Sequence, residues 1–172
     1  TSGLARKPGQ TRLDLAQANV NITKQIIPQI TKAAPNAIYV IVANPVDILT
    51  YQFIKTSGIP ENRIIGSGTI LDTARLRSRL AEYYKINQKN VHAYVFGEHG
   101  DSSFVPWSQA AICTTMVEDY YRDLEGEELD KQAAEEYVRK SGAEVIKRKG
   151  ATFYAVACAA VHICKVIFSG VD

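Results

Sequence analysis

The stretch that decides the fold is AIYVIVANPVDILTYQFIKTSGIPENRIIG, residues 37–66. It begins with AIYVIV, residues 37–42, a continuous apolar run rich in β-branched residues, which predicts a strand buried on both faces of a parallel sheet. The residues VDILTYQFIKTSG then predict a helix closed by Gly58, and RIIG, residues 63–66, predicts a second strand. A succession of strand, helix and strand is typical of a doubly wound α/β sheet.

The segments on either side extend this pattern. TRLD, residues 11–14, is a variant of the capping box and predicts that a helix begins there and ends at Pro35. Val91, Ala93 and Val95 alternate with other side chains, which predicts a half-buried strand over residues 91–96. The remaining predicted helices are a cationic one at 71–85, an exposed amphipathic one at 127–149 and a mostly buried one at 151–168.

The βα alternation loosens after GSGT, residues 66–69, so we expect a domain boundary there. The expected domains are residues 1–65, which continue an α/β sheet, and residues 66–172. The chain opens on a loop composition and closes on IFSGVD just after an apolar helical run. We therefore expect it to be part of a longer protein.

Composition excludes several classes of function. The net charge of +2 comes from 20 basic and 18 acidic residues spread along all 172, so the chain has no basic stripe for nucleic acid. No apolar segment is long enough to span a bilayer and no signal segment opens the chain, which predicts a cytoplasmic protein. Three cysteines without CxxC spacing argue against disulfides or a zinc site. Cys158 and His162 lie one helical turn apart, but their apolar neighbours favour core packing over metal binding.

Polar side chains at strand ends and helix starts are the candidates for chemistry. In YVFGEHGDSS, residues 94–103, His99 follows a strand that Gly97 ends, where catalytic groups are often mounted, although an ordinary turn histidine is equally compatible. Asp72 and Arg75 share one face of a helix and suit either a surface ion pair or a carboxylate-binding site. Asn44 lies at the carboxyl end of a predicted strand, where open α/β sheets bind ligands, or it simply turns the chain before a proline.

The opening loop gathers the cations Arg6, Lys7 and Arg12 around a Pro-Gly pair. Such a loop suits a lid that closes over an anionic substrate, and it also suits a set of solvated charges. From the residues alone, the chain is an α/β protein with a candidate site for a small carboxylate.

Four motifs in order, RKPGQTRLDL, NPVDILTY, GSGTILDTARLR and GEHGDSS, resemble the NAD-dependent lactate and malate dehydrogenase family, and its L-lactate branch most closely. The resemblance runs over essentially the whole chain. It implies a fold made of the C-terminal part of a Rossmann-type doubly wound parallel sheet, followed by an α+β substrate domain that is incomplete at its C-terminus. The family's Gly-rich dinucleotide turn, GxGxxG, is absent from these residues.

The resemblance also implies roles for the candidates. His99 would exchange the proton that reduction of a 2-oxo acid requires, and Asp72 would hold the imidazole and stabilise its protonated form. Arg12 would polarise the substrate carbonyl from the lid, and Arg75 would bind the substrate carboxylate as a two-point fork. The remaining matches are substrate contacts at Asn44 and Thr152 and cofactor contacts at Gly3, Leu4, Val42, Ala43 and Asn44, with NAD as the cofactor and no metal.

Arg6 departs from the lactate branch, which usually carries glutamine at that loop position, whereas malate enzymes carry arginine there. A buried Arg6 facing pyruvate would lack a partner, which costs several kcal/mol, about the penalty of one desolvated charge. The resemblance therefore implies interconversion of pyruvate and L-lactate, with oxaloacetate reduction as the alternative. A non-enzymatic alternative is an inactive fragment that cannot hold the cofactor.

Arg77 and His92 match positions at which many bacterial members of the lactate branch bind the activator fructose 1,6-bisphosphate across a subunit interface. Cations suit its phosphates, while ordinary surface roles for both residues are equally compatible. The family context further implies a homotetramer.

Overall fold

The structure of this chain is a computed structural model that divides into two compact units, each with its own sheet and its own apolar core. The first unit is Thr1–Gly68 together with His162–Asp172, and the second unit is Thr69–Val161. The residues that the structure describes are 3–4, 12–120 and 128–170, without the side chains at positions 12 and 13.

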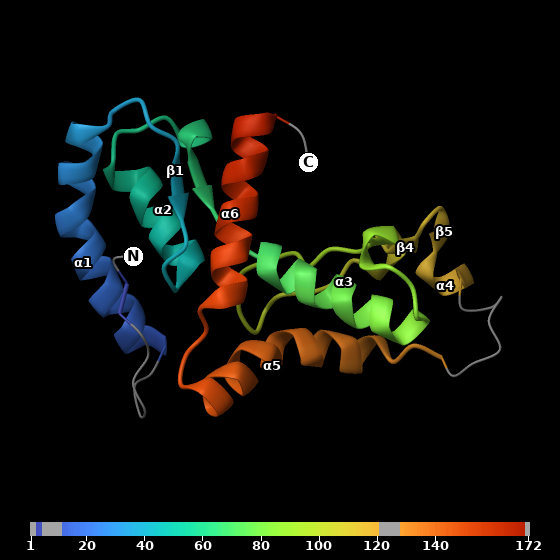
Figure 1. Cartoon of the computed structure of the whole chain (residues 1–172). Coiled ribbons are helices and arrows are strands. Elements are labelled where there is room, and N and C mark those ends of the chain that lie inside the picture. The colour runs from blue at the N-terminus through green and yellow to red at the C-terminus, as the bar shows by residue number, and fades with distance from the viewer. Residues whose placement is uncertain (1–2, 5–11, 121–127, 171–172) are drawn as a thin grey trace. The chain divides into compact units, whose positions relative to one another are not determined.

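The first unit contains two helices, the C-terminal half of α6 (Tyr154–Ser169) and a two-stranded parallel sheet (Figure 1). Its elements are α1 (Arg12–Ala33), β1 (Tyr39–Ile41), α2 (Val46–Thr56) and β2 (Ile64–Gly66), the last preceded by the short helix η1 (Glu61–Arg63). The strands pair in parallel, and α2 provides the crossover that a parallel pair requires. The predicted succession of helix, strand, helix and strand is confirmed.

The prediction that residues 37–42 form a strand buried on both faces is wrong. Only Tyr39–Ile41 pair with β2, and all three are half-buried. Within the described residues β1 has a neighbouring strand on one edge alone, so part of its apolar surface stays uncovered. An apolar hollow of about 260 Å³ accordingly lies beside β1, lined by side chains that include Ile27, Val40 and Phe53.

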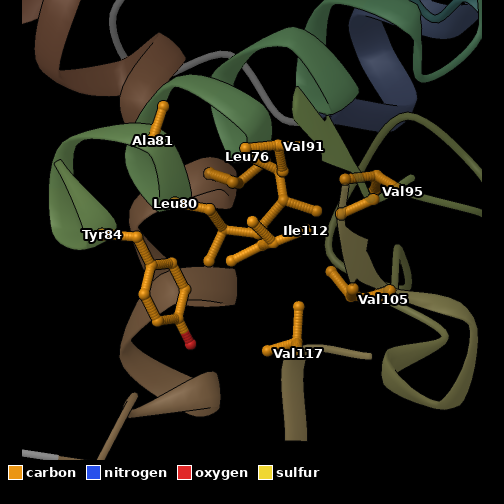
Figure 2. Close-up of a cluster of buried hydrophobic side chains, with 12 residues drawn as sticks. Leu76, Leu80, Ala81, Tyr84, Val91, Val95, Val105, Ile112 and Val117 are labelled. Carbon is orange, nitrogen blue, oxygen red and sulfur yellow. The ribbon is translucent and has the colours of Figure 1, made fainter. Parts of the chain in front are cut away.

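The second unit combines a three-stranded antiparallel sheet with α3 (Ile70–Tyr84) and α5 (Lys131–Lys149), which pack along one another (Figure 1). Figure 2 shows Leu76 and Leu80 of α3 beside Val91 and Ile112 of the sheet. The other elements are η2 (Gln88–Asn90), β3 (Val91–His92), η3 (Trp107–Gln109), β4 (Ala111–Ile112), β5 (Thr115–Met116) and α4 (Val117–Tyr120).

The alternation predicted for residues 91–96 is confirmed, although little of the segment pairs as a strand. Val91, Ala93 and Val95 are buried, while the residues between them are exposed. Regular pairing ends at His92, and a single antiparallel bridge then joins Phe96 to Phe104. The predicted strand therefore continues as an extended segment whose inner face belongs to the apolar core.

The predicted helix at 127–149 begins later, at Lys131, because the Asp130 side chain caps it by accepting a hydrogen bond from the Ala133 N–H at 2.8 Å. Ala134 and Val138 lie on its buried face. Residues 121–127 lie outside the described part of the chain.

The predicted helix at 151–168 is present, but the prediction that it is mostly buried is wrong. The helix is present as α6 (Tyr154–Ser169), but Ile163 is its one buried residue, and Phe168 is 89% exposed. An apolar composition makes burial favourable only where another layer can cover the helix. Within the described residues most of its circumference has no such layer.

Candidate active site

Asp72 is a buried carboxylate in the first turn of α3, where the partial positive charge of the helix N-terminus favours an anion. Its side chain is 7% exposed, so hydrogen bonds must replace the water that it has lost. One carboxylate oxygen, Oδ2, lies 2.5 Å from Nδ1 of His99. The other, Oδ1, accepts a hydrogen bond from Nη1 of Arg75 at 3.1 Å. One carboxylate thus joins the two residues that sequence reasoning had singled out on different segments.

His99 lies in a tight loop that closes on itself. Phe96 and Phe104 exchange two backbone hydrogen bonds, of 2.8 and 3.0 Å, at the base of the loop. Gly97 adopts a φ of +88°, and a Cβ there would approach the Ser102 carbonyl to 3.2 Å, so the turn requires glycine. The imidazole remains about one-third exposed and therefore within reach of a small solute. This arrangement favours the catalytic interpretation of the histidine over the ordinary turn.

The far end of the loop is held by helix α5. Arg139 donates through Nη1 to the carbonyl of the buried Ser103 at 2.9 Å and to the Glu135 carboxylate at 3.1 Å. Trp107 donates through Nε1 to the same carboxylate at 2.8 Å. Sequence reasoning missed these residues, because a Glu-Arg pair at a spacing of four on a charged helix is typical of a solvated face. The nearby tryptophan was the only signal, since a partly buried indole needs an acceptor.

Arg75 is not a surface charge. Its side chain is 17% exposed, and Gly142 of α5 lies opposite the guanidinium, where an added Cβ would stand 3.9 Å from Nη2. A guanidinium carries five N–H donors in a fixed fork, so its bond to Asp72 does not exhaust its capacity to bind a carboxylate. The interpretation of Asp72 and Arg75 as an exposed ion pair is therefore wrong.

In the first unit, one buried amide brings two segments together. Asn19 of α1 is 1% exposed, accepts the Leu4 N–H at 2.8 Å and donates to the Asn44 carbonyl at 2.6 Å. A Cβ on Gly3 would approach that of Ala43 to 3.0 Å. The structure thus gathers the predicted cofactor contacts at the carboxyl end of β1, with the Asn44 side chain exposed. Sequence reasoning missed Asn19. The signal that could have indicated its burial is its position on the same helix face as the apolar residues of α1.

The remaining candidates are less defined. Arg6, Lys7 and the side chain of Arg12 lie outside the described residues. Thr152 is half-buried in the segment between α5 and α6. Among the described residues, no group of three or more side chains could hold a metal ion. Cys158 and His162 are both exposed on α6, so the prediction that they pack in a core is wrong.

The two candidates for the activator site lie in the second unit, Arg77 on α3 and His92 on β3. Arg77 donates through Nε to the Ala93 carbonyl at 3.1 Å, and its guanidinium lies 4.6 Å from the centre of the Tyr94 ring. His92 is exposed on β3. Arg77 therefore already supports the fold, whatever else it binds.

Comparison with known families identifies both halves of the chain. Residues 1–66 match the family model of the lactate/malate dehydrogenase NAD binding domain, and residues 69–172 match that of the lactate/malate dehydrogenase alpha/beta C-terminal domain. An L-lactate dehydrogenase of Clostridium botulinum is 46% identical over 169 residues, which cover 97% of this chain and 53% of that protein. One of Streptococcus equinus is 45% identical over 170 residues, which cover 98% of this chain and 52% of that protein.

Solved structures agree with these matches. A lactate dehydrogenase from a Medee basin deep-sea metagenome superposes with a TM-score of 0.92 at 40% identity, covering 98% of this chain and 54% of that one. The minor L-lactate dehydrogenase of Enterococcus mundtii, in its ligand-bound form, gives a TM-score of 0.90 at 39% identity over 97% and 54% of the two chains. The chain thus spans about half the length of the relatives that it matches. The α/β fold class expected from the sequence is confirmed.

Proposed function

Because this chain belongs to the lactate/malate dehydrogenase family, we propose that it carries the proton-transfer and substrate-binding residues of an NAD-dependent L-lactate dehydrogenase. The observation that carries this proposal is the Asp72 carboxylate, which holds His99 through one oxygen and Arg75 through the other. A general acid and a carboxylate-binding guanidinium on a shared anchor suit a 2-oxo acid, because its reacting carbonyl is adjacent to its carboxylate.

In the proposed reaction, pyruvate gains a hydride at its carbonyl carbon and a proton at its carbonyl oxygen to become L-lactate. NADH, when bound, supplies the hydride and leaves as NAD. His99 donates the proton, and its contact with Asp72 fixes the ring and stabilises the imidazolium before transfer. The Arg75 guanidinium binds the carboxylate and so orients the carbonyl towards the histidine.

The residues gathered around Asn44 fit a dinucleotide. They lie at the carboxyl end of a parallel strand, where α/β sheets bind nucleotides, and a Cβ on Gly3 would crowd the Cβ of Ala43, so the two segments pack too closely there for a larger residue. Gly3, Leu4, Val42, Ala43 and Asn44 would hold the cofactor. The Asn44 amide, which offers both a donor and an acceptor, is also suited to the substrate oxygen.

Further parts of the proposal rest on the resemblance. Arg12 polarises the carbonyl from the lid, and Thr152 forms a wall of the substrate pocket. The domains are the remainder of the dinucleotide-binding domain, residues 1–65, and the substrate domain, residues 66–172. None of the helices in the described part of the chain has the length and apolar composition that a bilayer crossing requires. We place the enzyme in the cytoplasm as a homotetramer.

Fructose 1,6-bisphosphate is the proposed activator, bound at Arg77 and His92. The support is chemical: Arg77 bonds the carbonyl of Ala93, the residue after the exposed His92, and a guanidinium and an imidazole both suit a phosphate. Activation would appear as a lower KM for pyruvate in the presence of the bisphosphate, and replacement of His92 by alanine would abolish that change.

A specific feature favours a second substrate. Arg6 on the lid has the charge needed to pair with the second carboxylate of oxaloacetate, which would make the protein a malate dehydrogenase. The non-enzymatic alternative is that these 172 residues, if they exist alone, cannot hold the cofactor. Detectable NADH oxidation by the purified 172-residue chain would exclude that alternative.

Steady-state NADH oxidation with pyruvate and with oxaloacetate, each with and without the bisphosphate, tests the proposal. We expect the larger kcat/KM with pyruvate. A hundredfold preference for oxaloacetate, which equals about 2.7 kcal/mol at the transition state, would instead assign Arg6 to substrate recognition and the protein to the malate branch.

A further inference from the structure

Thr69, the N-cap residue of α3, and Thr73, in the first turn of that helix, hold the backbone of the extended segment that leads to His99. The Thr69 hydroxyl donates to the Val95 carbonyl at 2.6 Å. The Val95 N–H donates to the Thr73 hydroxyl at 3.0 Å. Both backbone groups of one buried residue are thus bonded by side chains of a helix, although a neighbouring strand normally fills that role.

The spacing along α3 explains how a helix can do this. Thr69 and Thr73 are four residues apart and so lie one above the other on the same face. Arg77 continues that face four residues later and donates to the Ala93 carbonyl at 3.1 Å. Asp72 belongs to the same turn as both threonines. The helix is therefore fastened to the extended segment at three successive points.

This fastening bears on the contact between Asp72 and His99. The carboxylate is carried by α3, and the imidazole lies four residues beyond Val95 on a loop whose base is closed by glycine-dependent geometry. Because two backbone hydrogen bonds between Phe96 and Phe104 close this base, a displacement of Val95 shifts the loop that carries the ring. The 2.5 Å separation of Oδ2 and Nδ1 consequently depends on how the strand end is held against the helix.

We propose that Thr69 and Thr73 are positioning residues that fix His99 against Asp72, an inference that rests on the proposed role of His99 as proton donor. Neither hydroxyl contacts the imidazole. Each acts through the backbone of Val95. Thr73 holds the Val95 N–H and Thr69 holds the Val95 carbonyl, so the two hydroxyls together fix the position of this residue against the helix.

The test compares Thr73→Val and Thr69→Val with the wild-type protein in pyruvate reduction. Valine keeps the branched shape and removes the hydroxyl. We expect kcat to fall about tenfold to a hundredfold, as small misplacements of reacting groups do. KM should change little because Arg75 is intact. The midpoint of the pH profile of kcat/KM should move to lower pH, since a displaced carboxylate stabilises the protonated imidazole less.

Two controls separate positioning from general structural support. Thr73→Ser keeps the acceptor and should restore wild-type kcat and pH profile. Thr56→Val makes the same change at the end of α2, where the hydroxyl bonds only its own helix through the Gln52 carbonyl, and should leave both unchanged. Melting temperatures show whether each variant folds.

The outcomes are distinct. A folded valine variant with wild-type kcat and pH profile contradicts the inference, and so does loss of folding in both valine variants, because the hydroxyls then support the whole unit. If one valine variant fails to fold, the other decides. A wild-type protein that reduces no 2-oxo acid contradicts the proposed function itself, whereas a working enzyme with unaffected variants contradicts only the positioning role.

Discussion

Helix α3 carries two ion pairs that have the same spacing in sequence and differ in the structure. Asp72 and Arg75, near its N-terminus, are three residues apart, and their charged nitrogen and oxygen atoms are separated by 3.1 Å. Arg79 and Glu82, near its C-terminus, are also three residues apart, with a nitrogen–oxygen distance of 3.2 Å. The first pair is 7% and 17% exposed, with His99 as a further partner, whereas Glu82 is 72% exposed. Spacing and distance therefore do not decide what a charged pair does.

Burial decides it, because water competes for exposed charges and screens them. An exposed pair contributes about 0.3–0.5 kcal/mol. A buried carboxylate must instead keep every partner that replaces its lost hydration, which fixes those partners in space. The N-terminal pair of α3 is thus suited to hold reacting groups in place, whereas the C-terminal pair is a solvated surface contact.

The sharpest test of this contrast replaces each carboxylate by its amide. Asp72→Asn keeps the shape but loses the charge that stabilises the His99 imidazolium, so kcat/KM for pyruvate should fall about a hundredfold to ten-thousandfold. Glu82→Gln, the matched change on the same helix, should leave it within about twofold of wild type, in line with the small effect of an exposed pair. Equal effects of the two substitutions in steady-state assays would remove the distinction between the pairs.

The arginines should differ in the same direction. Arg75→Lys replaces a planar fork by a point charge, so KM for pyruvate should rise about tenfold to a hundredfold, the loss expected for a charged hydrogen bond. Arg79→Lys keeps an exposed charge and should leave KM unchanged. A fall in kcat at constant KM for Arg75→Lys would assign this residue to catalysis and would refute its role in carboxylate binding.

A third comparison concerns two Glu-Arg pairs at a spacing of four on α5. Arg139→Met removes the donor to the Ser103 carbonyl at the end of the His99 loop, which should lower stability by about 1–3 kcal/mol, the cost of an unsatisfied buried acceptor, and lower kcat as well. Arg148→Met breaks only an exposed contact of 3.9 Å with Glu144. Urea unfolding should show little change for this control, and a comparable loss in both variants would deny Arg139 its anchoring role.

The pair at the C-terminal end of α3 should show the small coupling of a solvated contact. A double-mutant cycle with Arg79→Ala and Glu82→Ala should give a coupling energy of about 0.3–0.5 kcal/mol at low salt, falling towards zero in 1 M salt. A salt-resistant coupling of several times that size would mean that the pair is not screened as its exposure requires.

The smallest effect is expected at Glu136, an exposed residue of α5. A hydrogen bond from Lys140, together with its charge, lowers the pKa of the Glu136 carboxyl below its ordinary value. The pair therefore contributes to stability at neutral pH, and this contribution is lost as the pH falls through the lowered pKa. Lys140→Met should raise the pKa of Glu136, which NMR titration would measure. It should also weaken the loss of the protein's stability at acidic pH. An unchanged titration of Glu136 would exclude Lys140 as the cause.

The order of elements could be predicted from the sequence because each has a local cause. The apolar run before Asn44 and the glycine after α2 act over a few residues. Burial of whole elements could not be predicted in the same way. The residues of β1 and α6 are apolar enough for a core, but what covers them depends on other segments of the protein, so both stayed partly exposed in the described residues.

The residues of the candidate site also divide into those that the sequence could indicate and those that it could not. His99, Asp72, Arg75 and Asn44 could be singled out because polar residues at strand ends and helix starts are unusual and because their motifs resemble one family. Asn19 and the threonines of α3 could not, because each looks like an ordinary helix residue until its distant backbone partner is known.

By itself, the sequence determined the succession of elements, the family and the chemical groups available for proton transfer and carboxylate binding. Only the tertiary structure decided which groups meet: that Asp72 contacts His99 across 27 residues of chain, and that one of two equally spaced ion pairs is buried while the other is exposed. The physical reason is range. Propensities, caps and periodicity act between near neighbours, whereas desolvation and hydrogen-bond partnership depend on residues that only the folded chain brings into contact.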